Sequence, residues 1–313
     1  MSMQTVIITG GTGLVGKSLT KLLVDKGFEV IILTRNTHNQ PQFLHVSYAH
    51  WDVAKQKIDT DALAKADFII HLAGAGVVDK KWTAAYKNEI VTSRTKSSEL
   101  LINTLKNNNH KVQAIISASA IGWYGPDIIH GKQFIETDPA DNSFLGNTCK
   151  EWEESIEPAT NLGIRVCKLR TGIVLSKKGG ALAEFIKPIK MGVAAILGNG
   201  KQIVSWIHID DLCRMFLYAI ENNQLSGSYN AVAPMPVTNK NLTLTLAKII
   251  KGSFFIPMYV PSLILKIMLG QRSIEVLKSC DVSCEKIKAT GFIFLYPSIE
   301  AALKNITTTS NSA

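Results

Sequence analysis

The chain has 313 residues, 46% of them hydrophobic and 19% charged, and carries a formal net charge of +9. This length suffices to bury a large core, in one domain with a lobe or in two domains, and the composition excludes a disordered chain. Lysine and arginine are dispersed, without basic runs interleaved with aromatic residues, so the charge indicates a solvated surface and no nucleic-acid partner. The longest apolar candidate, Val260 to Leu269, is too short to cross a membrane and contains Lys266, so we expect no membrane partner.

The five cysteines are scattered along the chain, which favours free thiols in a reducing compartment. The N-terminal apolar run is short and begins a strand, so we expect no signal peptide and a cytoplasmic protein. Cys280 and Cys284 lie close in sequence, but no nearby histidine or second cysteine pair completes a tetrahedral zinc site. The sequence therefore predicts no metal.

The first predicted elements are a strand, a glycine-rich turn and a helix. Gln4 to Thr9 has the β-branched composition of a buried strand, and Lys17 to Lys26 has the leucine spacing of a helix. Between them, Gly10 permits a tight turn, Gly13 lets the backbone approach a pyrophosphate, and Gly16 lets the helix pack close to the strand. Glycines that only make a turn are the alternative interpretation.

This turn is predicted to hold the phosphates of a dinucleotide. The free N–H groups at the start of the helix, at the positive end of its dipole, would donate to them. The predicted binding residues are Gly10, Thr12, Gly13, Leu14, Val15 and Gly16.

The second strand, Phe28 to Leu33, indicates which dinucleotide is bound. An acidic residue about 20 positions on would favour NAD, whereas a 2′-phosphate needs a cation. Glu29 lies at the far end of the strand, but the strand is followed by Thr34 and Arg35, whose guanidinium is well placed to bind a 2′-phosphate. We therefore predict NADP(H); a solvated surface arginine is the alternative.

Strands and helices alternate through the rest of the first half. The predicted strands are 46–48, 67–72, 112–119 and 164–169, and the predicted helices 59–66, 82–106 and 147–162. After the strand that begins at Asp67, the small residues Ala73 to Gly76 would let the chain pass under the cofactor's ribose and nicotinamide, with Leu72, Ala73 and Gly74 as predicted binding residues. The pattern predicts an α/β fold, a Rossmann-type doubly wound parallel sheet with a smaller C-terminal α/β substrate lobe.

The predicted domains are a dinucleotide-binding domain over 1–170, with contributions from about 200–235, and a substrate lobe with a C-terminal module over 171–306. In the lobe, Ala181 to Lys190 reads as a helix closing over the cleft, and Gly198 to Gly200 as a hairpin-like turn. Asp210 or Asp211 caps a helix through Glu221, and His208 reads as a structural histidine. Residues 307–313 are expected to be disordered.

Several motifs together resemble the extended short-chain dehydrogenase/reductases, and within them the atypical branch of nucleoside-diphosphate-sugar epimerase family proteins. The resemblance covers nearly the whole chain. Its motifs are Gly10-x-x-Gly13-x-x-Gly16, His71-Leu72-Ala73-Gly74, Trp82-Thr83, Ser93-Arg94, Ser117-Ala118-Ser119-Ala120, Trp123-Tyr124-Gly125, Trp152-Glu153, Gly179-Gly180-Ala181-Leu182, Leu197-Gly198-x-Gly200, Ser205-Trp206-Ile207-His208, Val260-Pro261, Leu269-Gly270, Gly291-Phe292 and Tyr296-Pro297.

Members of the wider superfamily that transfer hydride use a Tyr-x-x-x-Lys pair on the helix after the fifth strand, but no tyrosine in this chain has lysine four residues later, and Cys149 is itself a mark of the branch that the chain resembles. The two positions fall on Leu145 and Cys149, and Lys150 is one residue out of register, a rotation of about 100° on a helix. The matching serine, Ser119, and the nearby Tyr124 are the candidates for binding a substrate oxygen and supplying a proton. A turn cap and a core ring, respectively, are the alternatives.

The resemblance also implies that Glu89 and Arg94 lie along the cofactor, with a solvated helix face as the alternative. Arg170, at the ligand-side end of the sixth strand, would face an anionic ligand. Two functions stay open. One is an NADP(H)-dependent epimerase or reductase of a nucleotide-sugar or small carbonyl compound. The other is a non-catalytic NADP(H)-binding sensor or scaffold.

Overall fold

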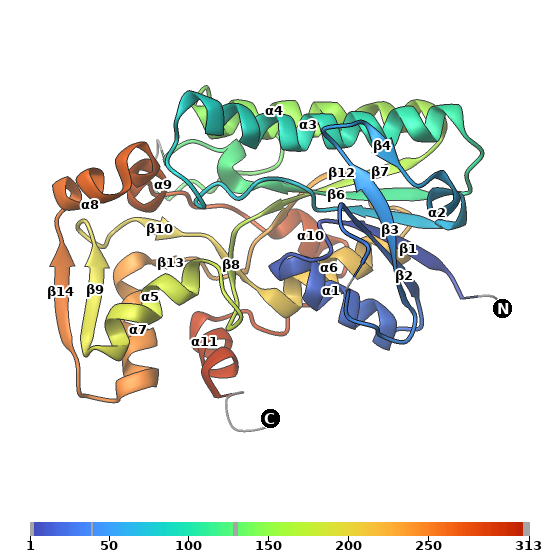
Figure 1. The fold of residues 1–313 in the computed structure, drawn as a ribbon. Coiled ribbons are helices and arrows are strands. Elements are labelled where there is room, and N and C mark those ends of the chain that lie inside the picture. Colours follow the sequence, from blue (N-terminus) through green and yellow to red (C-terminus); the bar gives the residue numbers. More distant parts are fainter. Residues whose placement is uncertain (1–2, 39, 128–130, 309–313) are drawn as a thin grey trace.

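The computed structural model describes residues 3–38, 40–127 and 131–308. Within them the largest sheet has eight strands (Figure 1). Neighbouring strands are parallel except β4, which is antiparallel to β3. In sheet order the strands are β12 (Gly227–Ala231), β7 (Arg165–Thr171), β6 (Ala114–Ala120), β5 (Phe68–His71), β1 (Thr5–Thr9), β2 (Glu29–Thr34), β3 (Val46–Asp52) and β4 (Lys57–Ile58).

The strand order reverses at β1, which places the ligand-binding edge of the sheet. From β1 the chain proceeds outward through β2 and β3 on one side, and returns to β5, β6 and β7 on the other. Ligands of such sheets bind outside the carboxyl ends of the strands at this reversal. There Thr9 of β1 and His71 of β5 are register partners. The predicted Rossmann-type fold is confirmed.

Helices cover both faces of the sheet, with α3 and α4 on one face and α1, α6 and α10 on the other (Figure 1). Alternate residues of β1 point into the two cores: Ile7 packs with Leu101 of α3, while Val6 and Ile8 pack with Leu19 of α1. A strand that is buried on both faces has a continuous run of apolar residues in its sequence, and for this reason β1 could be predicted from the sequence. The helices are α1 (Leu14–Asp25), α2 (Thr60–Lys65), α3 (Ala84–Asn107), α4 (Phe144–Ile156), α6 (Ile209–Glu221) and α10 (Glu285–Ala289).

The remaining elements form a lobe at one end of the sheet, at the left of Figure 1. Leu182, Trp206, Leu242 and Leu303 are completely buried in its separate core. The strands pair as β8 with β11, β9 with β14 and β10 with β13. The lobe elements are β8 (Ile173–Leu175), α5 (Ala181–Lys190), β9 (Val193–Leu197), β10 (Ile203–Val204), β11 (Trp206–His208), β13 (Val237–Thr238), α7 (Asn239–Lys251), β14 (Ile256–Val260), α8 (Ser262–Leu269), the 3-10 turn η3 (Gly270–Arg272), α9 (Ser273–Leu277) and α11 (Ile299–Thr308). Two further 3-10 turns belong to the main sheet: η1 (Ile121–Trp123) follows β6, and η2 (Glu157–Leu162) follows α4.

Three local predictions were wrong. The helix expected over 147–162 begins earlier, at Phe144, and changes to the 3-10 turn η2 after Ile156, because Pro158 cannot continue an α-helix. The turn at 198–200 joins no hairpin, since β9 and β10 pair with different strands. Residues 307 and 308 belong to α11, and the rest of the expected disordered tail, 309–313, lies outside the described residues.

The cap of α6 also differs from the prediction. Neither Asp210 nor Asp211 caps the helix; His208 does, and its Nδ1 accepts a hydrogen bond from the Asp210 N–H at 3.1 Å. The Asp211 carboxylate instead accepts from the N–H groups of Leu295 and Tyr296 and so fastens α6 to the C-terminal module. His208 has the structural role that the sequence predicted. Among the described residues, no helix has both the length and the apolarity needed to cross a membrane.

Candidate cofactor and active site

The glycine turn after β1 has one packed side and one open side. Gly10 has φ +69°, and a Cβ there would lie 2.9 Å from the Leu72 carbonyl oxygen. A Cβ on Gly16 would lie 2.5 Å from the Gly10 oxygen, so both positions require glycine for close packing. A Cβ on Gly13 would meet only the Gly10 oxygen, at 3.3 Å. Gly13 therefore faces space that a bound group can occupy.

Helix α1 begins at this open side with free backbone donors. Gly13 is its N-cap, with no side-chain cap, and the first turn holds no acidic residue. The N–H of Gly13 donates to Gly10, but among the described residues the N–H groups of Leu14 and Val15 have no acceptor. Such donors at a helix N-terminus bind anions, and the residues present fit a dinucleotide pyrophosphate.

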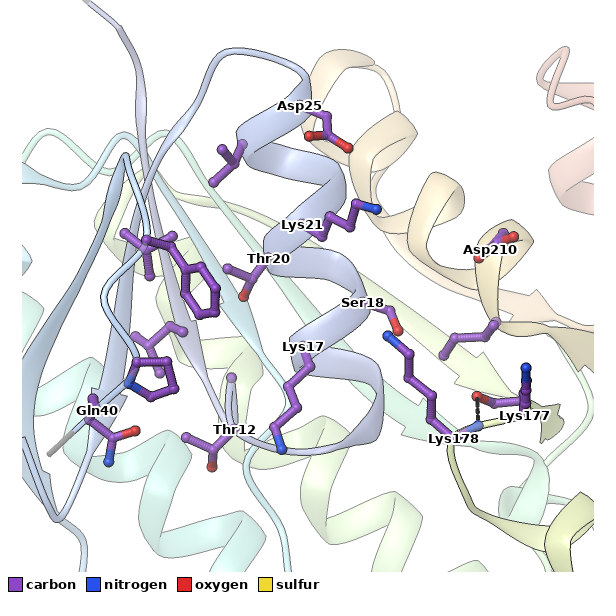
Figure 2. A pocket seen from close by; sticks show the side chains of 18 of the residues that line it. Thr12, Lys17, Ser18, Thr20, Lys21, Asp25, Gln40, Lys177, Lys178 and Asp210 are labelled. Atoms are coloured by element: carbon purple, nitrogen blue, oxygen red, sulfur yellow. Dashed lines mark hydrogen bonds between the residues drawn. The ribbon is translucent and has the colours of Figure 1, made fainter. Parts of the chain in front are cut away.

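A cavity of about 1050 Å³ extends from this turn along α1 and is lined by residues that include Gly11, Thr12 and Lys17. Figure 2 shows Thr12 and Lys17 at the N-terminal end of α1, and Lys178 extending toward the same helix near Ser18. The lining includes neither Leu14 and Val15 nor Leu72 and Ser119, so this cavity lies beside the glycine turn and along α1, away from the ends of β5 and β6. The lysines give this side of α1 a positive charge, which favours an anionic group in the cavity.

Thr9 and His71 connect the glycine turn to the end of β5, inside a fully buried network. The Thr9 hydroxyl oxygen accepts from the N–H groups of Leu72 and Ala73, each at 3.1 Å, and lies 2.8 Å from His71 Nδ1. Because the oxygen already accepts twice, its proton is donated to Nδ1. That assigns the neutral tautomer with the proton on Nε2.

The other ring nitrogen of His71 faces α3. Nε2 lies 3.2 Å from the hydroxyl oxygens of Ser97 and Ser98, whose protons are donated to the Arg94 carbonyl. Burial, reinforced by the charge of Arg94, lowers the pKa of His71 to about 3. The network therefore holds Leu72 and Ala73, which were predicted to lie under the cofactor, in a fixed position relative to the glycine turn.

Arg94 supports the loop after β5. Its Nη1 donates to the carbonyls of Ala75 and Ile90, and the guanidinium lies 4.8 Å from the centre of the Trp152 ring. A Cβ on Gly74 would be 3.0 Å from its guanidinium carbon. Arg94 is thus buried beneath the loop, and its predicted phosphate contact is not what this geometry provides.

The other predicted cofactor contacts differ in exposure. Glu89 is exposed and pairs with Lys80 at 3.2 Å, an arrangement of a solvated helix face. Arg35 is exposed at the end of β2 and has no acidic partner among the described residues. Beside it, the Thr34 hydroxyl accepts from the Asn36 N–H at 3.3 Å. Arg35 is therefore a cation available to a ligand.

Arg170 lies in a buried polar network centred on Glu153 of α4. Its Nε and Nη2 donate to the two carboxylate oxygens of Glu153, at 2.8 and 3.1 Å. The hydroxyls of Ser119 and Ser228 donate to the same carboxylate, at 2.7 and 2.8 Å. Burial would raise the pKa of Glu153, but these hydrogen bonds and the Arg170 charge outweigh it and lower that pKa. Arg170 thus has an internal anion as its partner, which explains its position without the predicted anionic ligand.

Tyr124 belongs to the same network. Its side chain is fully buried and stacks on Phe134, with 5.0 Å between ring centres. Its hydroxyl donates to Asn230 at 2.7 Å and accepts from Arg170 at 3.0 Å. Burial raises the pKa of Tyr124 to about 12, although Arg170 and Asn230 oppose the rise. Both candidate catalytic hydroxyls, of Ser119 and Tyr124, are thus engaged within the protein, and their catalytic role stays a prediction.

The two positions of the missing catalytic pair pack against the turn that follows β6. A Cβ on Gly122, in η1 after β6, would lie 3.4 Å from both Leu145 Cβ and Cys149 Sγ. Leu145 and Cys149 are buried, whereas Lys150 is exposed and pairs with Glu154 at 3.9 Å on the outer face of α4. Lys150 therefore does not replace the absent lysine.

The Thr9–His71 network generates a prediction on pH and stability. In the folded state His71 stays neutral down to about pH 3, while in the unfolded chain it takes a proton near pH 6.5. Its contribution to stability is complete above pH 6.5 and is lost as the pH falls toward 3, by at most about 1.4 kcal/mol per pH unit.

Chemical denaturation between pH 7 and 4 measures this slope. We expect His71→Gln to be less stable at pH 7 but to lose less stability on acidification. His50→Gln, at an exposed position of β3, should follow the parent. Parallel pH profiles for His71→Gln and the parent would contradict the assignment.

Comparison with known proteins gives the family. The family model "NAD dependent epimerase/dehydratase family" matches residues 6–232, and that of a domain of unknown function, DUF1731, matches residues 260–306. Epimerase family protein SSP1921 of Staphylococcus saprophyticus is 35% identical over 307 residues, which are 97% of this chain and 99% of that protein. Epimerase family protein SAOUHSC_00792 of Staphylococcus aureus is 36% identical over 306 residues, with the same two coverages.

Solved structures agree with this. The human epimerase family protein SDR39U1 (isoform 2), solved with NADPH, superposes with a TM-score of 0.84 at 28% identity, over 97% of this chain and 99% of that one. A nucleoside-diphosphate sugar epimerase from Corynebacterium glutamicum superposes with a TM-score of 0.76 at 31% identity, over 97% of this chain and 58% of that one. The protein is a member of the NAD dependent epimerase/dehydratase family and carries the DUF1731 module at its C-terminal end.

Proposed function

We propose that the protein binds NADP(H) and acts as an epimerase-like oxidoreductase on a nucleotide-sugar or a small carbonyl compound. The observation that carries the proposal is the set of free donors at the reversal of the strand order. The N–H groups of Leu14 and Val15 lie at the open side of the glycine turn, and Arg35, just after the adjacent strand, has no acidic partner in the described part of the chain. NADPH in the structure of the human relative supports the same cofactor.

Each part of the chain has a distinct task in this proposal. Leu14 and Val15 bind the pyrophosphate, and Arg35 binds the 2′-phosphate with its planar fork of donors. Leu72 and Ala73, held by Thr9, support the nicotinamide half. When bound, the nicotinamide supplies hydride transfer, while the chain orients the substrate and handles its proton.

The proton donor is non-standard in this proposal, because Leu145 and Cys149 stand where the usual tyrosine and lysine would be. Ser119 and Tyr124 are the candidates at the end of β6. Either would have to exchange a hydrogen bond to Glu153 or Asn230 for one to the substrate. A protein that binds NADP(H) without turnover is the other outcome that the experiments below distinguish.

Replacing Arg35 with Asp tests the cofactor preference. It should weaken NADP(H) binding by about 2 to 4 kcal/mol, because a charge-assisted pair gives way to a carboxylate facing a phosphate. NAD(H), which has no 2′-phosphate, should be weakened far less. Fluorescence titration of both cofactors measures this, with Lys65→Asp as a control for the change in net charge. Equal losses for both cofactors would show that Arg35 does not bind the phosphate.

Tyr124→Phe tests the proton donor. We expect the free energy of unfolding to fall by about 1 to 3 kcal/mol, because Asn230 and Arg170 each lose a buried hydrogen-bond partner. The NADPH affinity should stay unchanged, because the aromatic ring is retained. A general acid would instead show a fall in kcat of about 10²- to 10⁴-fold.

The assay follows the absorbance of the reduced cofactor with a panel of nucleotide-sugars, ketones and aldehydes, and follows sugar products by chromatography. Ser228→Ala, which removes another hydroxyl from the Glu153 network, is the matched control. A fall in kcat for Tyr124→Phe that Ser228→Ala does not share, measured under conditions in which both variants are folded, would identify Tyr124 as the acid. No turnover of any compound by the parent, beside tight NADPH binding, would favour the non-catalytic function.

A further inference from the structure

The C-terminal module reaches the two loops that border the nicotinamide end of the cleft. Arg272, in η3, donates from Nη1 to the Val78 carbonyl in the loop between β5 and α3, at 2.6 Å. Six residues on, Lys278 donates from Nζ to the Tyr124 carbonyl just after β6, at 3.2 Å. The segment 272–278, which contains α9, therefore bridges the loops that follow β5 and β6 (Figure 1).

Lys278 is held at this place with most of its side chain covered. Its ammonium pairs with Glu275 at 3.2 Å, and the two side chains are 11% and 24% exposed. Its charge acts on the Asp141 carboxylate and on the buried thiol of Cys149. The ammonium is thus bound to the same turn after β6 in which Gly122 packs against Cys149, the position at which the wider superfamily has a lysine.

The charged groups near Lys278 differ in their other partners. Glu275 is its one ion-pair partner among the described residues, and the Asp141 carboxylate is itself bound by the Ser143 N–H at 2.8 Å. Arg94, the other cation acting on Cys149, is turned away to the carbonyls of Ala75 and Ile90. Lys278 is therefore the cation of this group that the C-terminal module supplies, and it is held beside the loop after β6.

We propose that Lys278, supplied by the C-terminal module, provides the positive charge at the nicotinamide end of the cleft that α4 lacks at Cys149. The inference rests on the proposed NADP(H) function and adds a role for the DUF1731 module. A fixed positive charge there disfavours the cationic oxidised nicotinamide relative to the neutral reduced one. It also attracts a substrate oxygen that carries negative charge.

The two redox forms of the cofactor are the probe, because they carry the same phosphates and differ in the charge of the nicotinamide ring. The dissociation constants of NADP⁺ and NADPH are measured by calorimetry for the parent, Lys278→Met and Lys278→Arg. In Lys278→Met the ratio of the NADP⁺ constant to the NADPH constant should fall about 3- to 10-fold, as expected for two charges several Å apart in a partly screened site. Lys278→Arg, which keeps the charge, should keep the parent ratio.

Lys150→Met is the matched control, since it removes a lysine from the outer face of α4 and should leave the ratio unchanged. In the parent, the ratio should also fall as salt is added, a measurement that needs no variant. A purely structural Lys278 would change both constants together, and an unchanged ratio in Lys278→Met beside intact NADPH binding overturns this inference alone. Failure of the parent to bind NADPH would overturn the proposed function and this inference together.

Discussion

The cleft depends on one buried hydroxyl, that of Thr9. Its oxygen accepts from the N–H groups of Leu72 and Ala73, and its proton goes to His71. This links the ends of β1 and β5, the strands between which the order of the sheet reverses. The loops that follow these strands are the ones predicted to hold the phosphates and the nicotinamide half, so their relative position is fixed before a ligand arrives. Such preorganisation lowers the ordering cost of binding.

A second buried network makes the neighbouring part of the site rigid in a different way. Ser119, Arg170 and Asn230 are register partners across β6, β7 and β12, and Glu153 and Tyr124 complete their hydrogen bonds. A buried ion pair is costly unless its remaining hydrogen bonds are satisfied, and here the two serine hydroxyls satisfy them. The two hydroxyls that the sequence suggests for catalysis, of Ser119 and Tyr124, are thus hydrogen-bonded within the fold. A substrate must either compete with these hydrogen bonds or react through other groups.

A structural feature could be predicted from the sequence when the residues that determine it lie close together in the chain. The strands, the glycine turn and the Rossmann-type sheet were predictable because residue pattern and spacing determine them within about 30 residues. The partners of Arg94 and Arg170 could not be predicted. The sequence pattern of a cation near a strand end is the same whether that cation contacts a ligand, a backbone carbonyl or Glu153. Thr9 and His71 carried a readable signal, since each is a polar residue ending an apolar strand. Lys278 carried none, because its neighbour Tyr124 is 154 residues away.

The electrostatics around Cys149 explain why a lysine on α4 and a lysine from the C-terminal module are alternatives. Burial raises the pKa of the Cys149 thiol to about 12, against the charges of Arg94 and Lys278 that act on it. A lysine ammonium at position 149 would enter the same buried space and face these two cations, and like charges at short range in a partly buried site repel strongly. Restoring the Tyr-x-x-x-Lys pair through Leu145→Tyr and Cys149→Lys would therefore require removing the charge of Lys278 as well. In the arrangement that we propose, the neutral Cys149 and the cationic Lys278 are two parts of one site, and the C-terminal module supplies the lysine that α4 lacks at position 149.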